Sequence, residues 1–366
     1  MSEQTTDGDS LTDEATAHTG HLLGAGDIRR IAADAGISPT KKFGQNFVID
    51  PGTVRRIVRE AGVTADTHVL EVGPGLGSLT LALLETGAAV TAVEIDPALA
   101  ARLPRTIAEF MPEATDRLTV VTADAMSLSP ETLPEFAADN VSRRNQNHSA
   151  TNTSTGSDAD DTDDKPSSNI EENEQTQRET SPADRNADTE KSLSDQPNAT
   201  DGNPFTLVSN LPYNVATPIL LTLLEQFDNL DHFLVMVQKE VADRLAAKPS
   251  SKIYGTPSVK LAWYGRAERV GLVGRNVFWP APNVDSALVS FKRYDENEQN
   301  KLASKASREK VFQLIDAAFS QRRKTLHAAL KKLVPAEAFA KAGIDPTRRG
   351  ETLTIHEFVA LAAAAI

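Results

Sequence analysis

Short apolar runs alternate with amphipathic stretches along most of the chain. Each run is five to seven residues long and rich in aliphatic and β-branched side chains, which is typical of buried strands. The alternation predicts an α/β fold on an open sheet, in which ligands bind at the carboxyl ends of the strands. The expected strands cover residues 68–72, 89–93, 118–122, 205–209, 232–237, 269–273 and 285–291.

The helical patterns change in character toward the C-terminus. The earlier ones lie among the strands, at 26–35, from Ser78, after Asp96-Pro97, and at 218–227, 238–245 and 258–264. Beyond a polar patch at 295–305 only short helices are expected, at 308–319, 322–333, 335–342 and 354–365. We therefore expect a sheet-bearing domain over residues 21–294 and a small all-helical C-terminal domain over residues 295–366.

Two segments lack the side chains that a core requires. Residues 1–20 are rich in Ser, Thr, Asp and Gly, and residues 137–203 contain 15 acids and no Phe, Trp or Tyr. Low hydrophobicity combined with high charge is typical of disorder. We expect a disordered acidic tail at 1–20 and a disordered acidic insertion at 137–203, which interrupts the sheet-bearing domain.

Composition excludes several kinds of chemistry. The 366 residues include no Cys, so disulfides, thiolate metal sites and cysteine nucleophiles are excluded, and the seven His show no metal-ligand spacing. We therefore expect no metal. The chain opens with no signal peptide and has no apolar run near the roughly 18–20 residues of a membrane span, so we expect a cytoplasmic protein. The net charge is −13, but residues 204–366 carry +6, which permits RNA binding.

A glycine-rich turn follows the first expected strand. The sequence Glu71-Val-Gly73-Pro-Gly75-Leu-Gly77 runs into the helix that starts near Ser78. Glycines let the backbone adopt positive φ and approach a ligand closely. The GxGxG spacing differs from the GxGxxG of dinucleotide sites, which argues against a pyrophosphate cradle. Alone, such a turn is weak evidence for a site.

Acidic residues follow the next two expected strands. Glu94 stands at the end of 89–93, where an acid can accept both hydroxyls of a ribose, although strand ends also carry acids for solvation. Asp124 follows 118–122 and would accept from an adenine amino group, with Met126 packing nearby, or would belong to an ordinary turn. Together with the glycine turn, these residues describe a nucleoside-shaped site along one edge of the sheet.

The tetrapeptide Asn210-Leu211-Pro212-Tyr213 follows the strand expected at 205–209. Asn210 offers a carbonyl acceptor, Pro212 removes a competing N–H, and Tyr213 offers a flat face. These are the parts needed to hold an exocyclic amine on a planar base. The plainer alternative is a strand followed by a proline turn.

Three further segments have two readings each. Residues 41–48 combine two lysines, aromatic residues and two amides. They form either a binding segment or a hydrophobic staple with a turn. Phe278 and Trp279 precede Pro-x-Pro in an expected rigid loop that presents a ring for stacking or fills a cleft. Arg322-Arg323-Lys324 opens the helix expected at 322–333 and suits phosphate contacts or a solvated face.

Taken together, the motifs resemble those of the ribosomal RNA adenine N6,N6-dimethyltransferase family, most closely its bacterial small-subunit (16S) branch. Eight segments match in the family's order over residues 26–366 apart from the insertion, which typical members lack. The segments are 43–47, 71–77, 94–96, 124–126, 210–214, 238–240, 278–286 and 319–325. Eight weak motifs in order make a specific match.

The resemblance implies a Rossmann-like S-adenosylmethionine-dependent methyltransferase fold with a mostly parallel seven-stranded sheet, so that residues 21–294 form the methyltransferase domain. The cofactor contacts that it implies, with Gly75 from the same glycine turn, are Asn46, Val48, Gly73, Gly75, Glu94, Asp124 and Asn210. Position 48 is usually Leu in the family and is Val here, which changes little if the contact is made by the backbone.

The implied reaction is dimethylation of N6 on two adjacent adenosines in a hairpin loop near the 3′ end of 16S rRNA, within the small ribosomal subunit. Asn210 and the Leu211 carbonyl would orient the amine, Pro212 would shape the turn, and Tyr213 and Phe278 would stack on the extruded base. Arg322, Arg323 and Lys324 would contact RNA. We expect in-line transfer by a monomer without a metal.

Three alternatives remain at this point. One is the related large-subunit rRNA dimethyltransferase that confers antibiotic resistance. Another is a non-catalytic ribosome-assembly or transcription factor on the same fold, for which a broken glycine turn or a lost Asn or Tyr would be expected. A DNA adenine methyltransferase would usually have an acidic first residue in the tetrapeptide, whereas this chain has Asn210.

Overall fold

The computed structural model describes residues 21–37, 45–137 and 204–365. The predictions made for the tail 1–20, for most of the insertion 137–203 and for Lys41–Gly44 lie outside the described residues. Among the described residues, no helix is long and apolar enough to cross a lipid bilayer.

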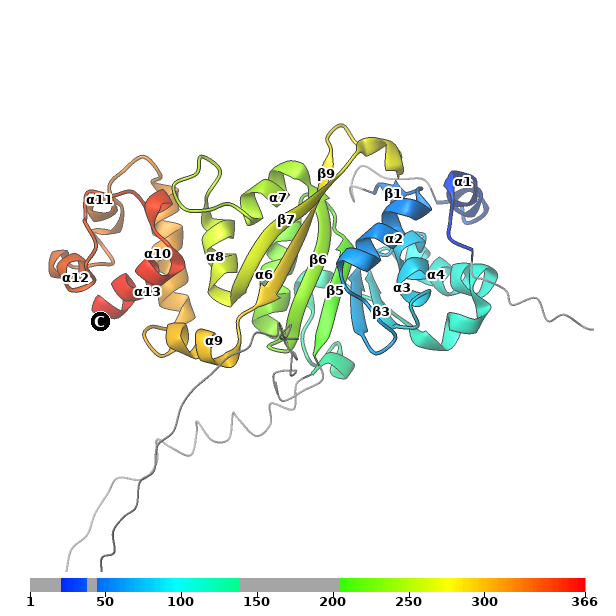
Figure 1. The fold of residues 1–366 in the computed structure, drawn as a ribbon, viewed down its shortest axis with the longest axis horizontal. Coiled ribbons are helices and arrows are strands. Elements are labelled where there is room, and N and C mark those ends of the chain that lie inside the picture. The colour runs from blue at the N-terminus through cyan, green and yellow to red at the C-terminus, as the bar shows by residue number, and fades with distance from the viewer. Residues whose placement is uncertain (1–20, 38–44, 138–203, 366) are drawn as a thin grey trace, which may run out of the picture. The chain divides into compact units, whose positions relative to one another are not determined.

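A seven-stranded sheet forms the centre of the fold, in the order β4-β3-β2-β5-β6-β9-β7 (Figure 1). The first five of these strands are parallel, and β9 pairs antiparallel with both β6 and β7. The strands are β2 (His68–Val72), β3 (Ala89–Glu94), β4 (Leu118–Thr122), β5 (Phe205–Asn210), β6 (Leu230–Gln238), β7 (Gly265–Val273) and β9 (Ser286–Arg293). Every strand predicted from the apolar runs is present, so the predicted mostly parallel seven-stranded sheet is confirmed.

Helices and short turns lie between and after the strands of this sheet, and α2 among them was not predicted. In the sheet-bearing part the helices are α1 (Ala25–Asp34), α2 (Pro51–Glu60), α3 (Ser78–Leu84), α4 (Pro97–Phe110), α6 (Ala216–Gln226), α7 (Lys239–Leu245) and α8 (Thr256–Tyr264). Short 3₁₀ turns are η2 (Pro112–Arg117), η3 (Ala125–Ser127), η4 (Pro134–Phe136), η5 (Arg275–Val277) and η6 (Gly350–Thr352). The later helices are α9 (Glu296–Ala303), α10 (Arg308–Ser320), α11 (Leu326–Leu330), α12 (Ala336–Lys341) and α13 (Ile355–Ala364).

Three local predictions were wrong. The polar patch at 295–305 contains helix α9, whose first turn is capped by the Asp295 side chain accepting from the Glu298 N–H. The helix predicted over 322–333 is only α11, because 321–324 form a turn before the Thr325 cap. The expected loop at Phe278–Trp279 is a short strand, β8, that pairs antiparallel with β1 (Phe47–Val48).

The pleat of the strands directs alternate side chains to two hydrophobic clusters. On β6, Phe233, Val235 and Val237 belong to the cluster with α6, α7 and α8, whereas Leu234 and Met236 belong to the cluster with α1 to α4. A strand that is apolar on both faces requires helices on both faces. This is why the central strands read as continuous apolar runs in the sequence.

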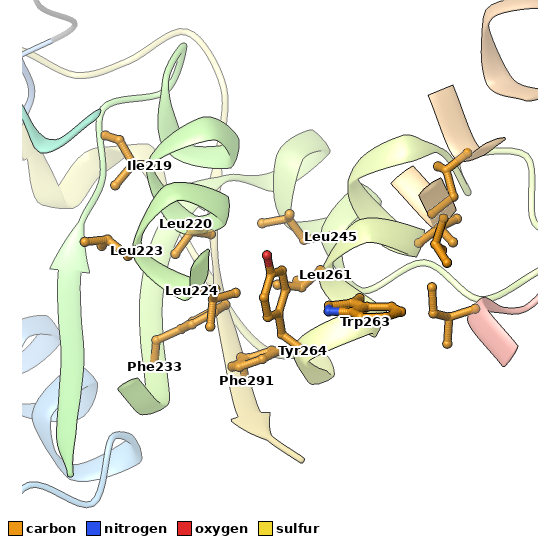
Figure 2. Close-up of a cluster of buried hydrophobic side chains, with 14 of the residues drawn as sticks. Ile219, Leu220, Leu223, Leu224, Phe233, Leu245, Leu261, Trp263, Tyr264 and Phe291 are labelled. Atoms are coloured by element: carbon orange, nitrogen blue, oxygen red, sulfur yellow. The ribbon is translucent and has the colours of Figure 1, made fainter. Parts of the chain in front are cut away.

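The C-terminal helices share the first of these clusters. Figure 2 shows Tyr264 turned toward Phe233 and Phe291 of the sheet, whereas Trp263 points toward the C-terminal helices. The Trp263 and Phe312 ring centroids lie 6.2 Å apart in an edge-to-face arrangement. One apolar cluster therefore continues from β6 to α13. The division of the chain at residues 294 and 295 stays a prediction.

Candidate functional site

A pocket opens at the carboxyl ends of β2, β3 and β5, where open α/β sheets hold ligands. It encloses about 1000 Å³ of empty space, counting the part that is open to solvent. Ten predicted site residues line it: Asn46, Val48, Gly73, Gly75, Glu94, Asp124, Asn210, Leu211, Pro212 and Tyr213. Segments far apart in the sequence are therefore brought together in one site.

The glycine turn between β2 and α3 forms one wall of the pocket. Gly73, Gly75 and Gly77 have φ values of +70°, +59° and +99°, which side chains with a Cβ rarely adopt. A Cβ on Gly75 would also lie 3.0 Å from the Phe47 ring. The turn therefore requires glycine, and it exposes backbone to a ligand.

Glu94 lies at the end of β3 with only 5% of its surface exposed. One carboxylate oxygen accepts from the Gly75 N–H at 3.2 Å and the other from the Asp96 N–H at 3.0 Å. Burial raises the pKa of Glu94, while the hydrogen bonds from Asp96 and Gly75 oppose that rise. The carboxylate is thus fixed in the pocket wall, where it can accept the hydroxyls of a ribose.

Asp124 lies in the pocket wall at the start of η3, where its Oδ1 accepts from the Met126 N–H at 2.9 Å. The turn reading is therefore confirmed, and the side chain also lines the pocket, whereas its contact with an adenine amino group stays a prediction. Met126 itself is 47% exposed and does not line the pocket. The packing of Met126 beside a ligand stays a prediction.

Glu71 lines the same pocket and was not among the predicted site residues. It is 1% exposed, and the Thr80 hydroxyl donates to its Oε2 at 2.7 Å. Burial raises the pKa of Glu71 to about 8, with a further contribution from nearby Glu94. The available signal was an acid inside an otherwise apolar strand, two residues before the first glycine.

Asn210 joins the tetrapeptide to the segment before β1. Its side-chain Nδ2 donates to the Asn46 carbonyl at 3.2 Å, across 164 residues of sequence. The Leu211 N–H donates to the Met236 carbonyl at 3.0 Å, which extends the pairing of β5 with β6 by one residue. These two bonds fix the backbone and side-chain amide at the mouth of the pocket.

Tyr213 is held by a residue that sequence analysis did not single out. Its hydroxyl lies 3.0 Å from the Oγ of Ser286, a fully buried residue at the start of β9. Burial raises the pKa of Tyr213, so the phenol is neutral at pH 7. A neutral ring held at its far end presents a fixed apolar face.

Phe278 is not in the pocket of this structure. It is 3% exposed and packs in the cluster with α1 to α4, because its pairing with Val48 in the β1–β8 ribbon directs the ring inward. Its neighbour Trp279 stacks on Phe47 with ring centroids 6.3 Å apart. The pocket-lining aromatic from this ribbon is Phe47, and the stacking role for Phe278 stays a prediction.

The basic residues Arg322, Arg323 and Lys324 lie outside the pocket. Arg322 is engaged within the protein, since its Nε contacts Glu351 Oε2 at 2.7 Å and its Nη2 donates to the Lys252 carbonyl at 2.8 Å. Arg323 and Lys324 are exposed. The three residues therefore have different surroundings, although they are adjacent in sequence.

The charge of the pocket indicates the kind of ligand it accepts. The described residues that line it include Glu71, Glu94 and Asp124 but no Lys, Arg or His. Such a lining favours a cationic ligand and disfavours a pyrophosphate. It fits S-adenosylmethionine, which combines an adenosine with a sulfonium and an ammonium group. The described residues contain no group of His, Asp and Glu suited to a metal ion.

Two solved structures share this fold. A dimethyladenosine transferase from Plasmodium falciparum matches with a TM-score of 0.56 at 18% identity, covering 86% of this chain and 95% of that one. The 23S rRNA methyltransferase ErmE matches with a TM-score of 0.53 at 20% identity, covering 87% of this chain and 99% of that one. The predicted Rossmann-like S-adenosylmethionine-dependent methyltransferase fold is thereby confirmed.

Sequence relatives give a narrower result. Residues 38–365 match the family described as Ribosomal RNA adenine dimethylase. Ribosomal RNA small subunit methyltransferase A from Bifidobacterium adolescentis is 64% identical over 359 residues, covering 97% of this chain and 98% of that protein. The protein of the same name from Streptomyces griseus is 48% identical over 346 residues, covering 93% and 94%. The chain belongs to the ribosomal RNA adenine dimethylase family, as its motifs predicted.

Proposed function

We propose that this chain uses S-adenosylmethionine to dimethylate N6 of two adjacent adenosines in a hairpin loop near the 3′ end of 16S rRNA, in the small ribosomal subunit. The observation that carries the proposal is the tetrapeptide Asn210–Tyr213, fixed at the mouth of an acid-lined pocket. The names of the relatives support the small-subunit substrate. Ribosome biogenesis would place the enzyme in the cytoplasm, and we propose that it acts as a monomer.

The pocket residues divide between the parts of the cofactor. When bound, S-adenosylmethionine supplies an electrophilic methyl group. Glu94 would accept the ribose hydroxyls, and Asp124 would accept from the adenine amine. Asn46, Val48, Gly73, Gly75 and Asn210 would line the remainder of the cofactor.

Orientation of the target nitrogen is the catalytic task of Asn210 and Leu211. The lone pair of adenine N6 is delocalised into the ring, so the amine is a weak nucleophile until it becomes pyramidal. The Asn210 Oδ1 and the Leu211 carbonyl would accept the two N–H bonds and direct the lone pair toward the methyl group. In the transfer, the N6–methyl bond would form as the methyl–sulfur bond of the cofactor breaks, S-adenosylhomocysteine would leave, and the nitrogen would release one proton to solvent. The uncharged segment Asn210–Tyr213 would have to accommodate the first methyl group during the second transfer.

Tyr213 would hold the base while this happens. The extruded adenine would stack on the phenol ring, whose hydroxyl is anchored by Ser286 at 3.0 Å. Pro212 shapes the backbone between the amine acceptors and this ring. Phe278 would join the stack only if the β1–β8 ribbon shifted to release its side chain.

A large-subunit enzyme is less well supported. The likeness to ErmE is one of fold at 20% identity, whereas the small-subunit relatives are up to 64% identical over nearly the whole chain. A non-catalytic assembly factor is also disfavoured because the glycine turn, Asn210 and Tyr213 are all present and placed in one site.

The substrate is tested by methyl transfer from labelled S-adenosylmethionine to under-methylated small ribosomal subunits, followed by nucleoside analysis. We expect label in N6,N6-dimethyladenosine of 16S rRNA. Label confined to large-subunit RNA would support the large-subunit alternative, and the absence of transfer to either subunit would support the non-catalytic one.

The catalytic assignment is tested with Asn210→Ala. Loss of the amine acceptor is expected to lower the methyl-transfer rate by about 10²-fold or more, on the scale of a lost transition-state hydrogen bond. Asn297→Ala, which changes an exposed residue of α9, is the matched control and should retain the wild-type rate. A near-normal rate for Asn210→Ala, measured in single-turnover assays, would remove this residue from catalysis.

A further inference from the structure

A two-stranded ribbon, separate from the main sheet, lies at one side of the pocket. It consists of β1 and β8, which pair antiparallel with Phe47 opposite Trp279 and Val48 opposite Phe278. The N–H of the residue after β1 also donates to the Val277 carbonyl at 2.8 Å. Two segments that are far apart in the sequence are therefore fixed to each other beside the pocket.

Strand β1 contacts two different walls of the pocket. The Phe47 ring packs against the glycine turn, where a Cβ on the second glycine would lie 3.0 Å from it. The Ser78 hydroxyl at the start of α3 donates to the Val48 carbonyl at 2.6 Å. On the side of the tetrapeptide, the Asn210 side chain donates to the carbonyl of Asn46, the residue before β1. A change in the position of β1 would therefore change both walls.

Trp279 supports β1 from outside the pocket. Its ring stacks on Phe47 with centroids 6.3 Å apart and 28° between the ring planes. Phe47 lines the pocket, whereas Trp279 does not. The indole is partly buried against the cluster with α1 to α4. Because stacked rings restrict each other's orientation, Trp279 holds the Phe47 ring without contacting a ligand in the pocket.

The chain after β8 leads to the residue that anchors the aromatic ring of the tetrapeptide. Residues 280–285 connect Trp279 to Ser286, whose Oγ lies 3.0 Å from the Tyr213 hydroxyl. Two prolines restrict the backbone of this connection. Strand β8 thus lies between the cofactor wall at β1 and the ring that would hold the target adenine.

We propose that Trp279 is a positioning residue that holds the cofactor wall in place and, through β8, couples cofactor binding to binding of the target adenine. The proposal rests on the proposed function, since it concerns the same site. Contact between a bound cofactor and β1 favours the position in which Phe47 and Trp279 are stacked. That position sets the start of the connection to Ser286, and so the placement of the Tyr213 ring. Coupling is reciprocal, so RNA raises the affinity for the cofactor by the same factor.

The response of Trp279 to the cofactor is observable by fluorescence, because the chain has only two tryptophans. Trp263→Phe leaves Trp279 as the single tryptophan, and Trp263 itself packs against Phe312 away from the pocket. We expect saturation with S-adenosylhomocysteine to change the Trp279 emission, and to leave the emission of Trp263 in a Trp279→Phe variant unchanged. Constant Trp279 emission, with binding verified by calorimetry, would overturn the proposal.

The positioning role is tested by the affinity of the free protein for S-adenosylhomocysteine. Trp279→Ala is expected to bind about tenfold more weakly, on the scale of one lost ring stack, whereas Trp279→Phe keeps a ring and should bind within about twofold of the wild type. Phe110→Ala is the matched control, since Phe110 is a partly buried ring on the same cluster that stacks on His21 and does not line the pocket. Its affinity should be that of the wild type. Equal losses from Trp279→Ala and Phe110→Ala would show a general effect of destabilisation and refute positioning.

The coupling is tested by measuring the same affinity with and without saturating under-methylated small ribosomal subunits. We expect subunits to raise the affinity of the wild type by about fivefold or more, and that of Trp279→Ala by less than about twofold. A wild-type factor near one, or equal factors for the two proteins, would refute the coupling. Failure of the wild type to methylate small-subunit RNA would instead refute the proposed function, and the measurements on the free protein do not depend on that outcome.

Discussion

At the scale of single residues, Glu71 has the most altered chemistry in the described site. Its pKa is raised to about 8 by burial, against 4.5 for an ordinary glutamate. The folded protein therefore binds a proton that the unfolded chain releases between these two values. This contribution to stability is complete below about pH 4.5 and is lost as the pH rises through 8.

We predict that Glu71→Gln, which keeps the shape but cannot ionise, removes this pH dependence. Relative to the variant, the wild type should lose about 1 kcal/mol of unfolding free energy per pH unit between pH 5.5 and 7.5. Urea unfolding at several pH values measures the difference. Glu113→Gln at an exposed position is the control and should run parallel to the wild type. Parallel curves for Glu71→Gln would mean that Glu71 is ionised in the folded protein.

The sequence predicted those site residues that follow strands directly. Gly73, Glu94, Asp124 and Asn210 are found this way because the carboxyl ends of parallel strands share one edge of the sheet. It did not predict the contact between Tyr213 and Ser286, because Ser286 is 73 residues later in the chain and reaches Tyr213 only through the position of β9 in the sheet. It also did not predict that the Phe278 ring packs inward and does not line the pocket, because that direction follows from the pairing of β8 with β1.

At the scale of elements, the end of α6 depends on a residue from β9. The last carbonyls of a helix lack partners within the helix. Arg293 donates to the Leu224 and Phe227 carbonyls at 3.0 and 2.8 Å, and to the Leu230 carbonyl at 2.8 Å. Burial lowers the pKa of Arg293. One guanidinium thus joins the helix, the following turn and the sheet.

We predict that Arg293→Met destabilises the protein by about 2–4 kcal/mol, because three partly buried carbonyls lose the charged donor that the structure shows for them. Arg266→Met on neighbouring β7 is the control, since Arg266 is exposed and pairs with Glu298 at the surface. The control should cost less than about 1 kcal/mol. Chemical unfolding measures both values, and equal losses would contradict a capping role for Arg293.

Element prediction from the sequence succeeded where an apolar pattern was long and failed where a local interaction decided the structure. The strands and α3 follow from periodicity. Helix α9 was missed because Leu302 is its only buried residue, so its apolar face is minimal. The helix expected from residue 322 was too long because the Arg322 side chain is drawn into contacts with Glu351 and Lys252 while the Thr325 hydroxyl caps α11.

At the scale of the whole molecule, the acidic insertion enters and leaves the fold at one place. Phe136 and Phe205, which flank it, have ring centroids 4.3 Å apart and are both buried. The aromatic contact therefore holds together the two ends of the fold between which residues 137–203 are inserted. A short flexible linker can replace most of that segment at a small cost in loop-closure entropy.

We predict that replacing residues 140–200 by a short Gly/Ser linker leaves the melting temperature within about 3 °C of the wild type, and methyl transfer within about twofold. The segment removed contains no aromatic residue to contribute to a core. Calorimetry and the subunit assay measure the two quantities. Phe136→Ala in the same background should cost about 3–5 kcal/mol. A large fall in melting temperature or in methyl transfer on linker replacement alone would mean that the insertion has a structural or catalytic role.

The long-range contacts of the pocket also set when, during synthesis, it can exist. Strands β2, β3 and β4 are neighbours in the chain and can pair soon after they leave the ribosome. The pocket wall at Asn46 and Phe47 cannot form until Asn210 and Trp279 have been synthesised, since these residues contact it. Tyr213 likewise needs Ser286. A chain that ends before β5 thus contains three of the seven strands and lacks these contacts of the pocket wall. We therefore expect a fragment that ends before Asn210 to bind S-adenosylmethionine more weakly than the complete chain does.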